Sequence, residues 1–148
     1  MDNSPHSIDA AKRAIELQKQ YGAEVVAFHS IKHHLAPKVL SAFNSFFYTT
    51  TTSTIPNYLE IEGNSIAQGK NILGKIKDIF EREGGQLETR LINHTTPKHY
   101  IEKTVISEEF DLVILGCKGE HSKVGELVLG SVAHDAVNHA RCDVLIVR

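Results

Sequence analysis

Short apolar runs that alternate with amphipathic runs constrain the fold of this chain more than any other feature. Three of them, "AEVVAFHSI" at 23–31, "DLVILG" at 111–116 and "DVLIVR" at 143–148, are rich in aliphatic residues and show little apolar–polar alternation. That pattern is typical of strands buried on both faces of a sheet. A fourth run, "QLETRLI" at 86–92, alternates and predicts a strand that is exposed on one face.

Helical patterns separate these strands. The predicted helices cover Pro5 to about Gly22, Asn64 to Glu83, Pro97 to about Phe110, and residues 131–140. Ser4 and Thr96 each precede a proline, which is the order of an N-cap and a first helical residue. The alternation of strands and helices predicts an open, doubly wound, mostly parallel α/β sheet with helices on both faces.

The helix predicted at 64–83 has the clearest buried face. Its spacing aligns a row of small and apolar positions, namely Ile66, Gly69, Leu73, Ile76 and Phe80. Two glycines at 84–85 then end the helix.

Residues 32–62 fit no regular element throughout. Within them a helical face of apolar positions is formed by Val39, Leu40, Phe43, Phe46 and Phe47. Such a stripe more often completes a core or a subunit contact than a ligand pocket. We therefore expect one domain over residues 1–148, with an insert at about 32–62.

Composition narrows the classes of partner. The formal net charge of −2 gives no reason to expect a nucleic acid or an anionic membrane as partner, and no apolar run approaches the roughly 20 residues of a membrane span. The two cysteines, Cys117 and Cys142, have no metal-ligand spacing and suit a reducing compartment. We expect a cytoplasmic protein.

The end of "DLVILG" is the strongest functional signal. The loop after this strand contains Gly116 and Gly119, and Gly130 with Ser131 stands at the start of the last helix. Ligands of parallel sheets bind beyond the carboxyl ends of strands, and a helix amino terminus attracts phosphate. The spacing matches neither a Walker loop nor a dinucleotide fingerprint. An alternative therefore stays open, in which the glycines form turns and Ser131 is an N-cap.

Residues 111–148 resemble the universal stress protein family. Its nucleotide-binding members carry Gly-x2-Gly-x9-Gly-[Ser/Thr] between a strand and the last helix. The stretch "DNSPHSIDAAKRAIELQKQYGAEVVAFHSI" also resembles the family's amino-terminal Asp-x-Ser, first helix and second strand. The resemblance covers most of the chain apart from the insert.

The resemblance implies that the sheet holds ATP or AMP, with Mg²⁺ or Mn²⁺ as a possible companion of ATP, in a homodimer paired through the final strand. Asp2 would face the adenosine, and the backbone at Ser30 would meet the adenine. The nucleoside would be lined by Leu115 and Gly116, and the ribose and phosphates would be held by Gly119, Gly130, Ser131 and Val132.

Two departures from the family pattern stand out. Ten residues, not nine, separate Gly119 from Gly130. The chain also has no first strand, which the family places in the middle of the sheet before Asp-x-Ser. Our hypothesis is that Met1 is an internal methionine and that the natural protein extends upstream. In the rival interpretation, the insert or a partner chain fills the gap.

The residues favour binding over catalysis. No Ser-His-Asp, Cys-His or paired-carboxylate arrangement is evident, so we expect no enzyme, with any ATP hydrolysis slow and incidental. The first interpretation is a nucleotide-responsive stress or regulatory protein. The alternative is a stress protein that binds no nucleotide and acts as a dimerisation or interaction module.

Overall fold

The computed structural model describes residues 1–31, 55–118 and 129–148, without the side chains of 55–62. Its elements, in chain order, are α1 (Pro5–Tyr21), β1 (Val26–Ser30), α3 (Ile55–Arg82), β2 (Glu88–Ile92), α4 (Pro97–Ser107), β3 (Leu112–Gly116), α5 (Ser131–His139) and β4 (Asp143–Val147). The predicted α/β order is therefore confirmed. None of the helices in the described residues combines the length and hydropathy that crossing a membrane requires.

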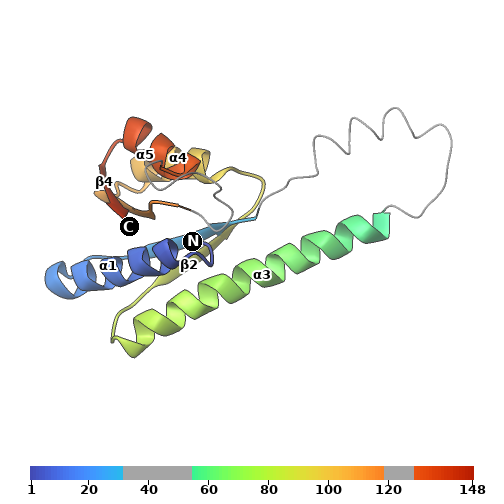
Figure 1. The fold of residues 1–148 in the computed structure, drawn as a ribbon, viewed down its shortest axis with the longest axis horizontal. Helices are drawn as coiled ribbons and strands as arrows, with labels where there is room; N and C mark the ends of the chain where they lie inside the picture. Colours follow the sequence, from blue (N-terminus) through green and yellow to red (C-terminus); the bar gives the residue numbers. More distant parts are fainter. Residues whose placement is uncertain (32–54, 119–128) are drawn as a thin grey trace.

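The strands form two parallel pairs. β1 pairs with β2 from Val26 opposite Glu88, and β3 pairs with β4 from Leu112 opposite Asp143. Figure 1 shows α1 and α3 on one face of the strands and α4 and α5 on the other. The helices that follow β2 and β3 therefore cover the face opposite to α1, as a doubly wound fold requires.

Local sequence signals set the helix ends as predicted. Ser4 caps α1 by accepting a hydrogen bond from Ser7 N at 3.1 Å, and Thr96 caps α4 by accepting one from His99 N at 3.3 Å. Gly22 ends α1 in the left-handed conformation, with φ of 66°.

The amino end of α3 differs from the prediction. The helix begins at Ile55 rather than Asn64, so the last part of the expected irregular insert is helical. Pro56 in the first turn is compatible with this start, because a first-turn residue needs no N–H partner. The amino-terminal part of α3 projects beyond the other described elements in Figure 1. The aromatic stripe expected at 39–47 lies outside the described residues.

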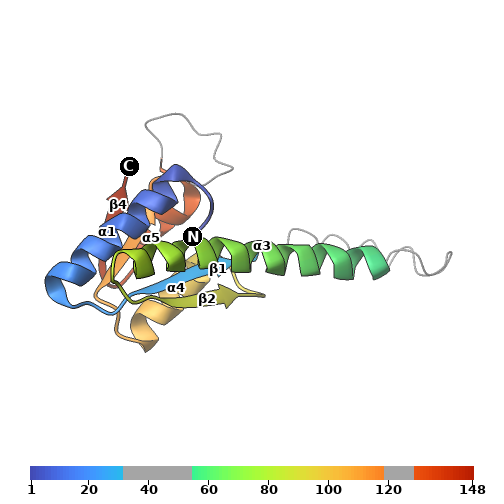
Figure 2. The ribbon, with the colours of Figure 1, turned by 90° about the horizontal axis from the view of Figure 1, so that it is seen from below.

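The hydrophobic core lies between α1 and α3. It joins Ala11, Ala14 and Ile15 of α1 to Ile76 and Phe80 of α3. Phe80 is only 1% exposed, and it belongs to the helical face that the sequence predicted. Figure 2 views the two helices from below, crossing the strands that they cover.

The strands are less buried than their sequences predicted. Ala27 is the only buried residue of β1, and none of the five residues of β3 or of β4 is buried. Each described strand has a strand neighbour on one side only, which accounts for this exposure. The remaining sides of β1 and β3 line a cavity between the two strand pairs.

Candidate functional site: a cavity between the two strand pairs

A cavity of about 1120 Å³ lies between β1 and β3. Residues of α1 and α3 line it from one face of the strands, and residues of α4 and α5 line it from the other. Its lining includes the carboxyl ends of β1 and β3, which form the edge at which parallel sheets bind ligands. We call this end of the cavity the mouth, and define it by Asp2, Ser30, Leu115, Gly116, Gly130, Ser131 and Val132.

The cavity lining includes seven of the eight residues that the sequence proposed as a binding site. They come from the amino terminus, from β1, from β3 and from the start of α5, which are far apart in the sequence. Gly119 lies outside the described residues, as does most of its loop.

Asp2 is held in a turn before α1. Its Oδ1 accepts a hydrogen bond from Ser4 N at 3.0 Å and lies 2.6 Å from the Ser4 hydroxyl. Ser4 Oγ also lies 3.2 Å from the Lys118 carbonyl, so this turn contacts the loop after β3. The carboxylate is thereby fixed near the end of β3.

The start of α5 is capped differently from those of α1 and α4. Gly130 is its N-cap and has no side chain to accept from the first-turn amides. The first bond within the helix runs from His134 N to Gly130 O at 2.9 Å, so the N–H groups of Ser131, Val132 and Ala133 precede the helical ladder. The alternative interpretation of Ser131 as the N-cap is wrong, because Ser131 is the first helical residue.

Gly116 lies close to another part of the chain. A Cβ at this position would be 2.7 Å from the His6 carbonyl carbon and 2.8 Å from its Cβ, so the glycine allows α1 to approach β3. Gly130 has φ of −61° and ψ of 155°, which any residue can adopt. Close approach, rather than left-handed backbone, therefore explains Gly116.

Ser30 ends β1 with its hydroxyl turned away from the strand. Its Oγ donates to the Thr95 carbonyl at 3.0 Å, in the loop after β2. Ile31 N donates to Ile92 O across the β1–β2 ladder, so the main-chain groups of Ser30 lie on the opposite edge of β1. That edge faces the cavity.

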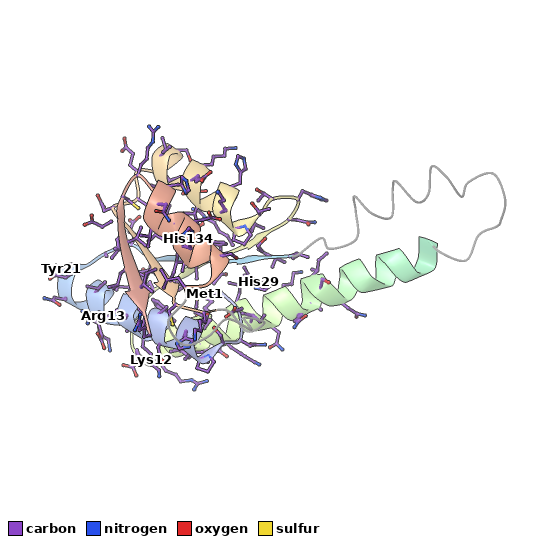
Figure 3. The ribbon with its side chains drawn as sticks, turned by 45° about the horizontal axis from the view of Figure 1, so that its top comes forward. Met1, Lys12, Arg13, Tyr21, His29 and His134 are labelled. Atoms are coloured by element: carbon purple, nitrogen blue, oxygen red, sulfur yellow. The ribbon has the colours of Figure 1, made fainter. Side chains whose placement is uncertain are left out.

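Met1 and His29 are mouth neighbours to which sequence reasoning assigned no role. His29 Nδ1 lies 2.6 Å from the Met1 carbonyl, and the two residues lie side by side in Figure 3. The Met1 ammonium donates to the Phe28 carbonyl. Burial lowers the pKa of this ammonium to about 6, against the opposing effect of the Asp2 carboxylate. The position of His29 at the carboxyl end of a predicted strand was the available signal.

The described residues of this site offer few side chains that could bind a metal ion. Among residues 1–31, 55–118 and 129–148, no three His, Cys, Asp or Glu side chains form a group that could hold a metal ion. Cys117 is buried, Cys142 is partly buried, and neither forms a disulfide. Asp2 is the only carboxylate of the mouth as defined above.

Comparisons with known proteins agree on one family. The family model described as "Universal stress protein family" matches residues 1–148. A universal stress protein of Methanocaldococcus jannaschii is 28% identical over 147 residues, which cover 99% of this chain and 78% of the relative.

Solved structures are similar over the whole chain. The universal stress protein UspA from Lactobacillus plantarum aligns with a TM-score of 0.76 and 23% identity, covering 100% of this chain and 93% of its own. The universal stress protein from Archaeoglobus fulgidus in complex with dAMP aligns with a TM-score of 0.67 and 17% identity, covering 100% and 92%. With a family model matched from the first residue to the last, the chain belongs to the universal stress protein family.

Proposed function

We propose that this protein binds an adenine nucleotide, ATP or AMP, at the mouth of the cavity. The proposal rests on the position of the α5 amino terminus. This terminus has a glycine as its N-cap, and it lies on the same cavity that Asp2 and Ser30 line. The dAMP complex of the Archaeoglobus relative supports the choice of an adenine nucleotide.

The phosphates would lie at the start of α5. The N–H groups of Ser131, Val132 and Ala133 precede the helical ladder, and the helix dipole adds about half a positive charge at this end. The Ser131 hydroxyl supplies one further donor.

The adenosine would lie between β1 and β3. The Ser30 N–H and C=O lie on the cavity edge of β1, and this pair of one donor and one acceptor suits the edge of an adenine ring. Leu115 and Gly116 supply the opposite wall, and Asp2 supplies a carboxylate for the ribose. With ATP, Mg²⁺ or Mn²⁺ would enter bound to the phosphates, and Asp2 is the carboxylate that could contact it.

The proposed role is that of a nucleotide-responsive stress or regulatory protein in the cytoplasm. Binding, not turnover, is the activity proposed, with any ATP hydrolysis slow and incidental. A nucleotide that contacts both β1 and α5 would favour one arrangement of these elements, and a partner could distinguish that arrangement from the free state.

Isothermal titration calorimetry tests the proposal. We expect saturable heat with ATP and Mg²⁺ and with AMP, and Gly130→Val should weaken binding at least about tenfold by blocking the approach to the α5 amides. Gly74→Ala is the matched control, because a Cβ there has no neighbour within 4 Å. Absence of heat with the wild-type chain, or equal affinity in the two variants, would favour the alternative of an interaction module without nucleotide.

We also propose a homodimer that forms through β4. Asp143 N donates to Asp111 O, and Val147 O accepts from Cys117 N, so alternation turns the main-chain groups of Val144 and Ile146 away from β3. An edge of this kind is suited to pairing with a second copy.

Light scattering tests the dimer. Ile146→Pro removes an N–H from the outer edge and should give a folded monomer, whereas Ile146→Ala keeps that N–H and should remain dimeric. A monomeric wild-type protein would contradict this proposal without affecting the nucleotide proposal.

A further inference from the structure

Gly69 lies in the middle of α3, where a glycine calls for a packing reason. A glycine in a helix interior is destabilising relative to alanine, because it loses more backbone freedom on folding. A Cβ at Gly69 would lie 2.5 Å from Leu91 Cδ1 and 2.8 Å from His29 Cδ2, closer than such atoms approach. His29 and Leu91 are paired neighbours on β1 and β2. The missing side chain therefore lets the backbone of α3 lie directly on this pair.

The His29 side chain points to the α3 face of the strands. Side chains alternate between the two faces along a strand. The preceding residue, Phe28, packs against Tyr100 of α4 with ring centroids 4.7 Å apart. His29 therefore lies on the opposite face, where α3 covers β1 and β2 in Figure 2.

The His29 ring fills the space between α3 and the residues before α1. Its Cδ2 and Nε2 face α3, since a Cβ at Gly69 would lie 2.8 Å and 3.4 Å from them. Its Nδ1 is the opposite vertex of the ring and lies 2.6 Å from the Met1 carbonyl oxygen. A carbonyl oxygen can only accept, so Nδ1 carries the hydrogen and donates. This contact therefore determines the tautomer of His29.

The hydrogen bond from His29 holds one end of the peptide unit that joins Met1 to Asp2. At the other end of the same unit, Asp2 N donates to Ser7 Oγ at 3.1 Å. Ser7 is a buried residue of α1. Because a peptide unit is planar, holding both its oxygen and its N–H determines its orientation. The point from which the Asp2 side chain leaves the backbone is thus set by His29 and Ser7 together.

These contacts form a continuous path from α3 to the mouth of the cavity. Gly69 sets how closely α3 approaches the His29 ring, and the ring holds the Met1 carbonyl. The peptide unit after that carbonyl carries Asp2, which lines the mouth. A displacement of the ring would therefore move the carboxylate.

We propose that His29 is a positioning residue that sets the place of the Asp2 carboxylate for a nucleotide, and that α3 acts on the site through it. This role rests on the nucleotide-binding function proposed above. His29 acts through Asp2 and does not need to touch the ligand. The packing of α3 against β1 thereby becomes part of what determines nucleotide affinity.

Calorimetry with AMP on two His29 variants tests the role. His29→Phe keeps a flat ring of similar size but removes the donor, and it should weaken AMP binding about threefold to tenfold, as expected for the loss of one hydrogen bond. His29→Asn keeps an N–H close to the position of Nδ1 and should restore most of the affinity.

Ile15→Ala is the control for stability. Ile15 belongs to the α1–α3 core and is not among the described residues that line the cavity. Its truncation should destabilise the fold and leave the affinity of the folded protein for AMP unchanged. A loss of affinity as large as that of His29→Phe would overturn the proposal, because the effect would then be one of stability.

A pair of glycine variants tests the link to α3. Gly69→Ala should displace the His29 ring and weaken AMP binding, whereas Gly74→Ala has no atom within 4 Å of its Cβ and should not. The effect of Gly69→Ala on affinity should disappear in a chain that already carries His29→Phe, because the hydrogen bond is absent there. Should His29→Phe fail to fold, the two glycine variants still test the proposal.

Hydrogen exchange at the Asp2 amide measures the position of the peptide unit without any nucleotide. It should be faster in His29→Phe and in Gly69→Ala than in the wild type and in His29→Asn. Equal AMP affinity in the wild type and in folded His29→Phe would overturn the role of His29 and leave the nucleotide proposal in place. Absence of heat with the wild type would instead contradict the nucleotide proposal, and the role of His29 with it.

Discussion

The mouth and the interior belong to one cavity, but they offer a ligand different groups. At the mouth, Asp2, Ser30 and the first turn of α5 present a carboxylate, strand-end main-chain groups and helical amides. The interior is the part of the cavity that six buried apolar residues line, namely Ala14, Ala27, Ile76, Phe80, Ile101 and Val105. The mouth therefore suits a small polar anion, whereas the interior offers only apolar side chains.

This difference shows why the cavity should not be interpreted as a single site. The polar groups of the mouth come from loops and helix ends, which determine function in α/β folds. Three residues of the interior, Ala14, Ile76 and Phe80, also belong to the α1–α3 core. Changes in the interior should alter stability first, and changes at the mouth should alter affinity first.

The largest expected effect concerns the interior. Phe80→Ala removes the most deeply buried side chain of the described residues and should lower the free energy of unfolding by about 3–5 kcal/mol. Urea denaturation measures this loss. Calorimetry on the folded fraction should give an AMP affinity within a few-fold of the wild type. A loss of affinity as large as that of Gly130→Val would contradict the distinction between the mouth and the interior.

The second effect is a pH dependence that arises from the Met1 amine. Burial lowers its pKa from 8.0 to about 6, so the unfolded state binds more protons between these values and stability rises with pH across this window. The gain is on the order of 2–3 kcal/mol for a shift of this size.

Comparison with an amino-terminally acetylated chain isolates this effect, because acetylation removes the titrating group and leaves Asp2 and His29 in place. The free chain should gain more stability from pH 6 to pH 8 than the acetylated chain does. Parallel stability curves would show that the ammonium is not buried.

The third effect links the mouth to the packing of α1. Gly116→Ala would place a Cβ 2.7 Å from the His6 backbone, so α1 must shift, at a cost of about 1–3 kcal/mol. Gly74→Ala is the control with open space around it, and should instead stabilise α3 by about 0.5–1 kcal/mol. Thermal denaturation compares the two, and shifts of the same sign would contradict the close approach at Gly116.

The smallest effect compares two helix caps. Ser4→Ala and Thr96→Ala should each cost about 1 kcal/mol of stability through loss of the cap. Only Ser4 also contacts Asp2 and Lys118, so its loss should additionally weaken AMP binding. Calorimetry on both variants distinguishes them, and equal affinities would remove Asp2 from the proposed site.

Much of the fold could be predicted because its signals are local. Ser4, Pro5 and Gly22 define the ends of α1 through contacts within a few residues, and the row from Gly69 to Phe80 reports the buried face of α3. The gathering of the mouth residues was also predictable, since parallel strands place their carboxyl ends at one edge. The start of α3 at Ile55 was missed, because the sequence of the insert has no clear helical signal there.

The sequence by itself determined the order of elements, the caps of α1 and α4, and the family to which the chain belongs. Only the tertiary structure decided that Gly116 faces His6, that Gly130 caps α5, and that β1 and β3 border a cavity. The physical reason is how far apart in the sequence the interacting residues lie. Caps and periodicity depend on hydrogen bonds and burial within a few residues, whereas the approach of His6 to Gly116 depends on how helices and strands distant in the sequence pack together.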